Sequence, residues 1–223
     1  DIEADSYNMN PELLELAINE NTKAIMPVSL FGQMPDLERI VKIAEKYELP
    51  VIEDAAQSFG ATRYDKKSCG ASLIGSTSFF PAKVFGCYGD GGALFSDCDD
   101  LANQMRAIRN HGGVKRGHHD VVGMNGRFDT IQAAVLLAKF PLFDNEVYLR
   151  ERIGKRYTNK FNQKGFYNTP HIEEYNSSVY AQYTIQVDNR EMIREYLKEK
   201  GIPTAIHYPI LLPDQVALNK KKK

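Results

Sequence analysis

The sequence has few cysteines, and their number and spacing exclude several kinds of site. Three cysteines among 223 residues, Cys69, Cys87 and Cys98, are too few and odd in number for a disulfide framework. No CxxC pair is present, and the adjacent His118 and His119 would point to different faces of a regular element, so we expect no metal site. Low cysteine use is typical of a reducing compartment, and we therefore expect a cytoplasmic protein.

The sequence also lacks an excess of either charge and any long apolar segment. Lys and Arg number 28 and Asp and Glu number 29, which gives a net charge of −1. Without a positive excess the chain would release few counterions from phosphates, so we expect no nucleic-acid partner. No apolar run approaches the roughly 18 residues that a membrane span needs, and no basic-then-apolar leader opens the sequence. We therefore expect neither a membrane span nor a secretory signal.

The first third of the sequence predicts a parallel βαβ unit. Asn10 and Pro11 are suited to be the cap and the first residue of a helix. Residues 23–30 and 51–56 are compact apolar runs, which are typical of buried strands. Between them, residues 35–49 carry apolar side chains at the spacing of one helical face. Strand, helix and strand with short joints imply a parallel pair with a right-handed crossover.

The rest of the sequence predicts shorter strands and several helices. Residues 75–80 and 92–96 read as strands joined by a loop too short for a crossover helix, so we expect an antiparallel pair. Pro141 is expected to end a helix and to mark a domain boundary, which gives an α/β large domain over residues 1–140 and a smaller α+β domain over residues 141–223. The remaining predicted elements are helices over residues 100–110, 128–140, 142–161 and 190–200 and a strand over residues 179–187.

Candidate chemistry lies on the loops beside the predicted sheet. Asp54 ends a predicted parallel strand, at the sheet edge where open α/β proteins bind ligands, although on position alone a loop or helix-capping aspartate is the more ordinary interpretation. Gln57 follows it and could be a surface amide. Lys83 is flanked by phenylalanines, and desolvation there would favour the neutral, nucleophilic amine; the alternative is a solvated loop lysine. Ser78 and its neighbouring hydroxyls could bind a phosphate or could simply end a strand.

A carboxylate, hydroxyls and a lysine on such loops match the needs of one cofactor, pyridoxal phosphate (PLP). PLP requires a carboxylate at its pyridinium nitrogen, donors for its phosphate and a lysine for its aldehyde. The glycines of residues 86–92 fit neither GxGxxG nor GxxxxGKS, so a dinucleotide site or a Walker site is not expected.

Two segments, PVIEDAAQSFGA at residues 50–61 and TSFFPAKVFGCYGDGGALF at residues 77–95, resemble the DegT/DnrJ family of sugar aminotransferases. The resemblance continues through VSLFGQ, RNHG, MNGRFDTIQAA, SVYAQYTIQVDNRE and GIPTAIHYPI, and so covers nearly the whole chain. It implies a PLP enzyme of fold type I, with a mostly parallel sheet in its large domain. It also implies transfer of an amino group from L-glutamate to a nucleotide-linked keto sugar, a UDP-3-keto-N-acetylhexosamine or its uronic acid, for surface polysaccharide (lipopolysaccharide) biosynthesis.

The resemblance implies a role for five residues at the cofactor. Lys83 matches the lysine that binds PLP covalently and moves the proton, and its presence favours transamination over the dehydration of relatives that carry histidine there. Asp54 matches the carboxylate at the ring nitrogen, and Gln57 the amide beside the phenolic oxygen. Ser78 matches a phosphate-binding hydroxyl, and Asn125 an asparagine that reaches the phosphate of the neighbouring subunit in a homodimer.

Three further residues match substrate-site positions that the family contributes across its dimer: Arg127, His207 and Tyr208. Arg127 could hold a carboxylate of glutamate or of a uronic-acid sugar with two parallel bonds. The alternative is that Arg127 caps or pairs near Asp129 at the start of the following helix.

The sequence departs from the family pattern at both ends. It begins inside the large domain, without the family's N-terminal helix and phosphate-binding loop, and ends before the last part of the small domain. We therefore expect a fragment, a truncated product or the known part of a longer chain. A PLP-binding regulator of the same family and an inactive fragment remain as alternatives to the aminotransferase.

Overall fold

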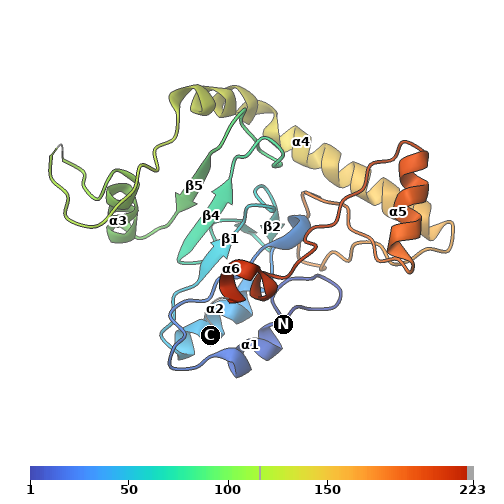
Figure 1. The fold of residues 1–223 in the computed structure, drawn as a ribbon, viewed down its shortest axis with the longest axis horizontal. Coiled ribbons are helices and arrows are strands. Elements are labelled where there is room, and N and C mark those ends of the chain that lie inside the picture. The colour runs from blue at the N-terminus through green and yellow to red at the C-terminus, as the bar shows by residue number, and fades with distance from the viewer. Residues whose placement is uncertain (116, 220–223) are drawn as a thin grey trace. The chain divides into compact units, whose positions relative to one another are not determined.

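The computed structural model describes residues 1–115 and 117–219 (Figure 1). Its internal contacts divide the chain into two units, Asp1–Ile185 and Gln186–Lys223. The expected division near residue 140 concerns the domains of the complete protein and stays a prediction. The first unit contains α1 (Pro11–Ala17), η1 (Leu30–Gly32), α2 (Leu37–Lys46), β1 (Ile52–Asp54), β2 (Thr62–Arg63), β3 (Lys66–Lys67), β4 (Ile74–Ser78), β5 (Gly92–Phe95), α3 (Asp99–Arg109) and α4 (Thr130–Asn162), and the second α5 (Arg190–Glu199), η2 (Leu212–Asp214) and α6 (Val216–Asn219).

The two helix starts predicted near residues 10 and 35 are confirmed. The Asn10 side chain accepts a hydrogen bond from the Glu12 N–H at 2.8 Å and caps α1, with Pro11 as first helical residue. The Asp36 side chain accepts from the Arg39 N–H at 3.1 Å and caps α2 in the same way. The apolar face of α2 is buried in the core through Leu37, Ile40 and Ala44.

The strands β1, β4 and β5 lie side by side in that order (Figure 1). β1 pairs with β4 in parallel, so that Asp54 lies opposite Ser76. β4 pairs with β5 antiparallel, as predicted from the short connection. Residues 23–30 were expected to form a strand beside β1, but they form only isolated parallel bridges at Ile25 and Val28. Pro27 lies between these bridges and has no N–H to donate, so a continuous ladder cannot form there.

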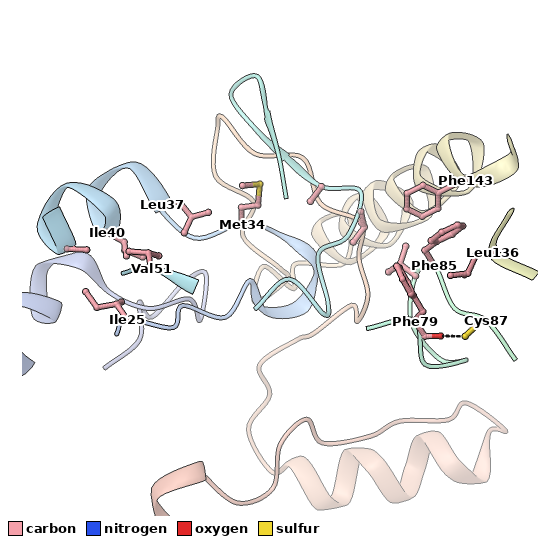
Figure 2. Close-up of a cluster of buried hydrophobic side chains, with 14 residues drawn as sticks. Ile25, Met34, Leu37, Ile40, Val51, Phe79, Phe85, Cys87, Leu136 and Phe143 are labelled. Carbon is pink, nitrogen blue, oxygen red and sulfur yellow. Dashed lines mark hydrogen bonds between the residues drawn. The ribbon is translucent and has the colours of Figure 1, made fainter. Parts of the chain in front are cut away.

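The buried side chains form one hydrophobic cluster, and Figure 2 shows two groups within it toward opposite ends of the view. One group packs α2 against the bridge between Ile25 and Val51 through Leu37 and Ile40. The other is aromatic and joins β4, the loop after it and α4. Its ring centroids are close: Phe85 to Phe143 measures 4.6 Å, Phe79 to Phe85 5.9 Å and Phe59 to Phe143 5.6 Å. Rings at these separations attract one another beyond their burial, which fixes α4 against the loop after β4.

The prediction that Pro141 ends a helix is wrong, because α4 runs through it as one helix of 33 residues. Proline removes one backbone hydrogen bond, the one that would reach the carbonyl of Leu137. Leu137 is 74% exposed, so water can reach that side of the helix. Phe143, two residues after the proline, is buried against Phe85 and holds the second half of the helix in place.

The strand expected over residues 179–187 is also not formed. Its backbone instead bonds to the η1 loop, with the Val179 N–H donating to Gly32 O at 2.9 Å.

In Gln186–Lys223, the helix expected over residues 190–200 is present as α5. Gly201 has a φ of 72°, and its N–H donates to Lys198 O at 3.0 Å, while the Ile202 N–H donates to Leu197 O at 2.9 Å. This is the Schellman arrangement, and it confirms the capping role predicted for Gly201.

No helix among residues 1–115 and 117–219 is both long enough and apolar enough to span a bilayer.

Candidate active site

The carboxyl ends of β1 and β4 bring a carboxylate and a hydroxyl to one edge of the sheet. Asp54 is the last residue of β1, and Ser78 is the last residue of β4. Because the two strands are parallel neighbours, a pairing that the sequence analysis did not predict, both residues lie at the same edge. The Ala55 N–H donates to Ser76 O at 2.8 Å, so the pairing continues just beyond the end of β1.

Asp54 is held by its own loop but is not neutralised. Its Oδ1 accepts a hydrogen bond from the Ala56 N–H at 3.0 Å, which is the geometry of a loop aspartate. The side chain is half-buried, and it forms no ion pair with any residue that the structure describes. Its second oxygen therefore remains able to accept from a protonated ring nitrogen.

Gln57 is buried rather than at the surface, so the interpretation as a surface amide is wrong. Only 5% of its surface is exposed. Its Oε1 accepts a hydrogen bond from the Phe31 N–H at 2.8 Å, which ties the loop after β1 to η1. Phe31 has a φ of 58°, a conformation that non-glycine residues adopt only at a cost, and the Gln57 bond supports it.

The three hydroxyls at the end of β4 differ in what they do. The Ser76 hydroxyl donates to Glu53 O at 2.9 Å, and the Thr77 hydroxyl donates to Ala55 O at 3.2 Å, so both bind β4 to β1. The Ser78 oxygen only accepts, from the Phe80 N–H at 3.2 Å. Within the described part of the chain its proton has no acceptor, so Ser78 is the hydroxyl that can donate to an anion.

Lys83 lies in residues 79–91, the loop between β4 and β5, which we term the lysine loop. Its N–H donates to Phe80 O at 2.9 Å, and the next residues, Val84 and Phe85, are buried in the aromatic group. The Lys83 side chain is half-buried, and its ammonium makes no hydrogen bond or ion pair with the described residues. The structure therefore combines an anchored loop with an uncommitted amine.

Asn125 and Arg127 are exposed and contact each other. The Arg127 Nε donates to the Asn125 Oδ1 at 3.1 Å. No ion pair between Arg127 and Asp129 is present in the described structure, and the Asp129 side chain does not cap α4. Phe128, next to Arg127, packs on Phe79 with ring centroids 6.0 Å apart, so this segment lies against the base of the lysine loop.

His207 and Tyr208 belong to the second unit, whereas the other six candidates belong to the first. Both side chains are exposed, and their ring centroids are 5.8 Å apart in an edge-to-face arrangement. The structure places Asp54, Gln57, Ser78 and Lys83 on the loops and strand ends after β1 and β4. Asn125 and Arg127 belong to the same unit but follow α3, where Asn125 bridges Asn110, and His207 and Tyr208 belong to the other unit.

Two contacts with the lysine loop were not predicted from the sequence. Gln132 and Lys139, both on α4, bond to backbone atoms of Tyr88 and Gly86. The available signal was polar residues at positions 132 and 139 on the face of α4 that also carries the buried Leu136.

The chain matches known proteins over its whole length. The model of the DegT/DnrJ/EryC1/StrS aminotransferase family matches residues 1–223. UDP-2-acetamido-2-deoxy-3-oxo-D-glucuronate aminotransferase of Pseudomonas aeruginosa is 52% identical over 222 residues, which cover 100% of this chain and 62% of that protein. A DegT DnrJ EryC1 StrS aminotransferase from Brucella abortus has a TM-score of 0.92 and 41% identity, covering 98% of this chain and 60% of that one.

A third similar structure carries a cofactor. The ntda protein of Bacillus subtilis, solved with bound cofactor PMP, has a TM-score of 0.87 and 31% identity over 100% of this chain and 52% of that one. The chain therefore spans between 52% and 62% of the length of these relatives. Because the family model matches it from end to end, the chain belongs to the DegT/DnrJ/EryC1/StrS aminotransferase family.

Proposed function

We propose that the protein is a PLP-dependent aminotransferase that moves an amino group from L-glutamate to a nucleotide-linked keto sugar. The sugar is a UDP-3-keto-N-acetylhexosamine or its uronic acid, in keeping with the relative of Pseudomonas aeruginosa. The observation that carries the proposal is the carboxyl-end edge of the sheet, where a carboxylate and a free hydroxyl proton come from adjacent strand ends and the loop that follows β4 carries an uncommitted amine.

This donor set fits PLP. When bound, PLP supplies an aldehyde that amines attack and a ring that takes up electrons. Lys83 would provide the amine that binds the aldehyde, and its Nζ would accept and return the proton during transfer. Asp54 would keep a proton on the ring nitrogen through its free oxygen. Ser78 would donate its hydroxyl to the phosphate, and Gln57 would be the amide on the phenolic-oxygen side.

The substrate carboxylates require a cationic partner. The Arg127 guanidinium is exposed and held at its Nε by Asn125, so its two terminal nitrogens remain available for a bidentate bond. Asn125 reaches the phosphate of the partner subunit in a homodimer, and His207 and Tyr208 contact the sugar. The product feeds surface polysaccharide biosynthesis in the cytoplasm.

The proposal can be tested by spectroscopy and trapping. The purified protein with PLP should show a visible band that glutamate bleaches and a UDP-linked 3-keto sugar restores. Borohydride reduction followed by peptide mass spectrometry should find the cofactor on Lys83, and Lys83→Ala should abolish both signals. A band that glutamate does not bleach would indicate a PLP-binding regulator instead, and no band would indicate an inactive fragment.

A further inference from the structure

The lysine loop is closed by bonds at its stem. The Phe79 N–H donates to Gly91 O at 2.7 Å, and the Cys87 N–H donates to Phe79 O at 2.8 Å. The Cys87 thiol adds a bond to the same Phe79 oxygen at 3.0 Å, the dashed line in Figure 2. These bonds hold the stem, but they do not fix the turn of the loop that carries Lys83.

The two arms of the loop touch backbone to backbone at Gly86. A Cβ atom built there would lie 2.6 Å from Phe80 O and 2.7 Å from Pro81 O, closer than real Cβ contacts allow. Phe80 O is also the acceptor of the Lys83 N–H. A shift of Gly86 would therefore move the same carbonyl that defines the Lys83 turn.

Helix α4 holds the second arm of the lysine loop, which contains Gly86 and Tyr88, with two side chains. Lys139 Nζ donates to Gly86 O at 2.5 Å, and Gln132 Oε1 accepts from the Tyr88 N–H at 2.8 Å. These residues are seven positions apart and lie on one helical face, with buried Leu136 between them. Figure 2 shows Leu136 beside Phe85 of the loop.

Lys139 is an unusual residue for this position. It is half-buried, and no carboxylate pairs with it in the described part of the chain. Its polar contact is a neutral carbonyl, and a bond from an ionised donor is stronger than one between neutral groups. A lysine that served only solubility would extend into water.

We propose that Lys139 and Gln132 are positioning residues that hold the Lys83 amine where PLP can receive it. The inference rests on the proposed function of Lys83. Lys139 acts through Gly86 and the Phe80 carbonyl. Gln132 holds the backbone of Tyr88, so that the residues after Gly86 do not pull it out of position. Neither side chain needs to contact the cofactor.

The first experiment uses the protein without cofactor. Lys139→Met removes the donor at similar length, Lys139→Arg keeps a cationic donor, and Lys155→Met is the matched control. Lys155 lies on the same helix, exposed and paired with Glu151 at 2.6 Å. Amide hydrogen exchange of Cys87 should accelerate about tenfold in Lys139→Met and stay near wild type in the other two variants.

The second experiment measures how fast Lys83 reacts with PLP. The visible band should grow about tenfold more slowly in Lys139→Met, because a misplaced amine spends less time in attack geometry. Lys139→Arg should recover most of the rate. In a Lys83→Ala background, Lys139→Met should leave PLP affinity unchanged, because the effect acts through Lys83; a general loss of structure would weaken that affinity.

Gln132→Leu and Gln132→Glu provide an independent pair if Lys139→Met does not fold. Gln132→Leu loses the acceptor, so the Tyr88 amide should exchange faster and the reaction with PLP should be slower. Gln132→Glu keeps the acceptor, so both rates should stay near wild type. If wild type, Lys139→Met and Gln132→Leu react with PLP at equal rates, this inference alone is overturned. A wild-type protein that PLP does not label at Lys83 would instead refute the proposed function and this inference with it.

Discussion

Glu53 should make the stability of the protein depend on pH. It lies within β1 next to Asp54, and none of its surface is exposed. Its Oε1 accepts from the Ser29 hydroxyl at 2.7 Å, and its Oε2 accepts from the Cys69 N–H at 2.8 Å. Burial nevertheless raises the pKa of Glu53 above 4.5, because loss of water outweighs the hydrogen bonds that favour the carboxylate.

The sign of the effect follows from linkage. The folded protein binds the Glu53 proton more tightly than the unfolded chain does, so this contribution to stability is fully present below pH 4.5. It is lost as the pH rises through the folded-state pKa. Over that window a single group can change the free energy of unfolding by at most about 1.4 kcal/mol per pH unit.

Two substitutions separate the charge from the hydrogen bonds. In Glu53→Gln the amide oxygen can accept from the Cys69 N–H and the amide nitrogen can donate to the Ser29 oxygen, so the cost at low pH should be about 1 kcal/mol. Glu53→Leu leaves the Ser29 hydroxyl and the Cys69 N–H without acceptors. At roughly 1–3 kcal/mol for each buried unpaired group, it should cost about 2–6 kcal/mol.

Urea unfolding at a series of pH values measures both effects. The stability difference between wild type and Glu53→Gln should shrink as the pH rises above 4.5, because only the wild type has this group to ionise. Glu53→Leu should be the least stable variant at low pH. A difference between wild type and Glu53→Gln that is constant across the series would refute the reasoning.

The other predictions concern the proposed site and one thiol. Asp54→Asn should slow transamination by roughly 10³-fold with PLP still bound, measured by single-turnover absorbance. Mixing Lys83→Ala with Asn125→Ala subunits should restore activity if the sites are shared, and an active monomer in sedimentation would contradict this. Arg127→Lys should lower kcat/KM for a uronic-acid sugar more than for the neutral hexose, with no change in melting temperature. Equal losses of kcat/KM for both sugars would exclude a role in binding that carboxylate. Cys69 should resist iodoacetamide in the folded protein and react in urea, because burial raises its pKa to about 12.

The sequence predicted those parts of the fold whose cause is local. The helix α2 was predicted because apolar residues recur on one face over residues 35–49, and the Asp36 cap that the structure shows at its start is also a local cause. The position of Asp54 at the carboxyl end of a parallel strand was predicted from the βαβ pattern, whereas the parallel pairing of β1 with β4, which brings Ser78 to the same edge, was not. The strand expected over residues 179–187 failed because a strand requires a partner, and its backbone bonds to the η1 loop instead.

The contacts that orient Lys83 depend on residues far apart in the chain. No periodicity shows that Lys139 donates to Gly86 or that Gln132 accepts from Tyr88, because each bond joins a side chain to a backbone atom of a remote loop. The burial of Gln57 could not be predicted for the same reason. Its side chain is buried and bonds to the N–H of Phe31, a remote residue that the sequence around Gln57 does not indicate.

The error at Pro141 bears directly on the proposed site. Lys139 and Phe143 lie on either side of this proline, and both contact the lysine loop, Lys139 through Gly86 O and Phe143 through the ring of Phe85. If the helix ended at Pro141, the two side chains would not share a face, and the loop would lose its contact with Phe143. The proline is tolerated because the carbonyl it leaves unpaired lies on the exposed side, while the aromatic packing lies on the other. The continuity of α4 is therefore part of what holds the Lys83 turn.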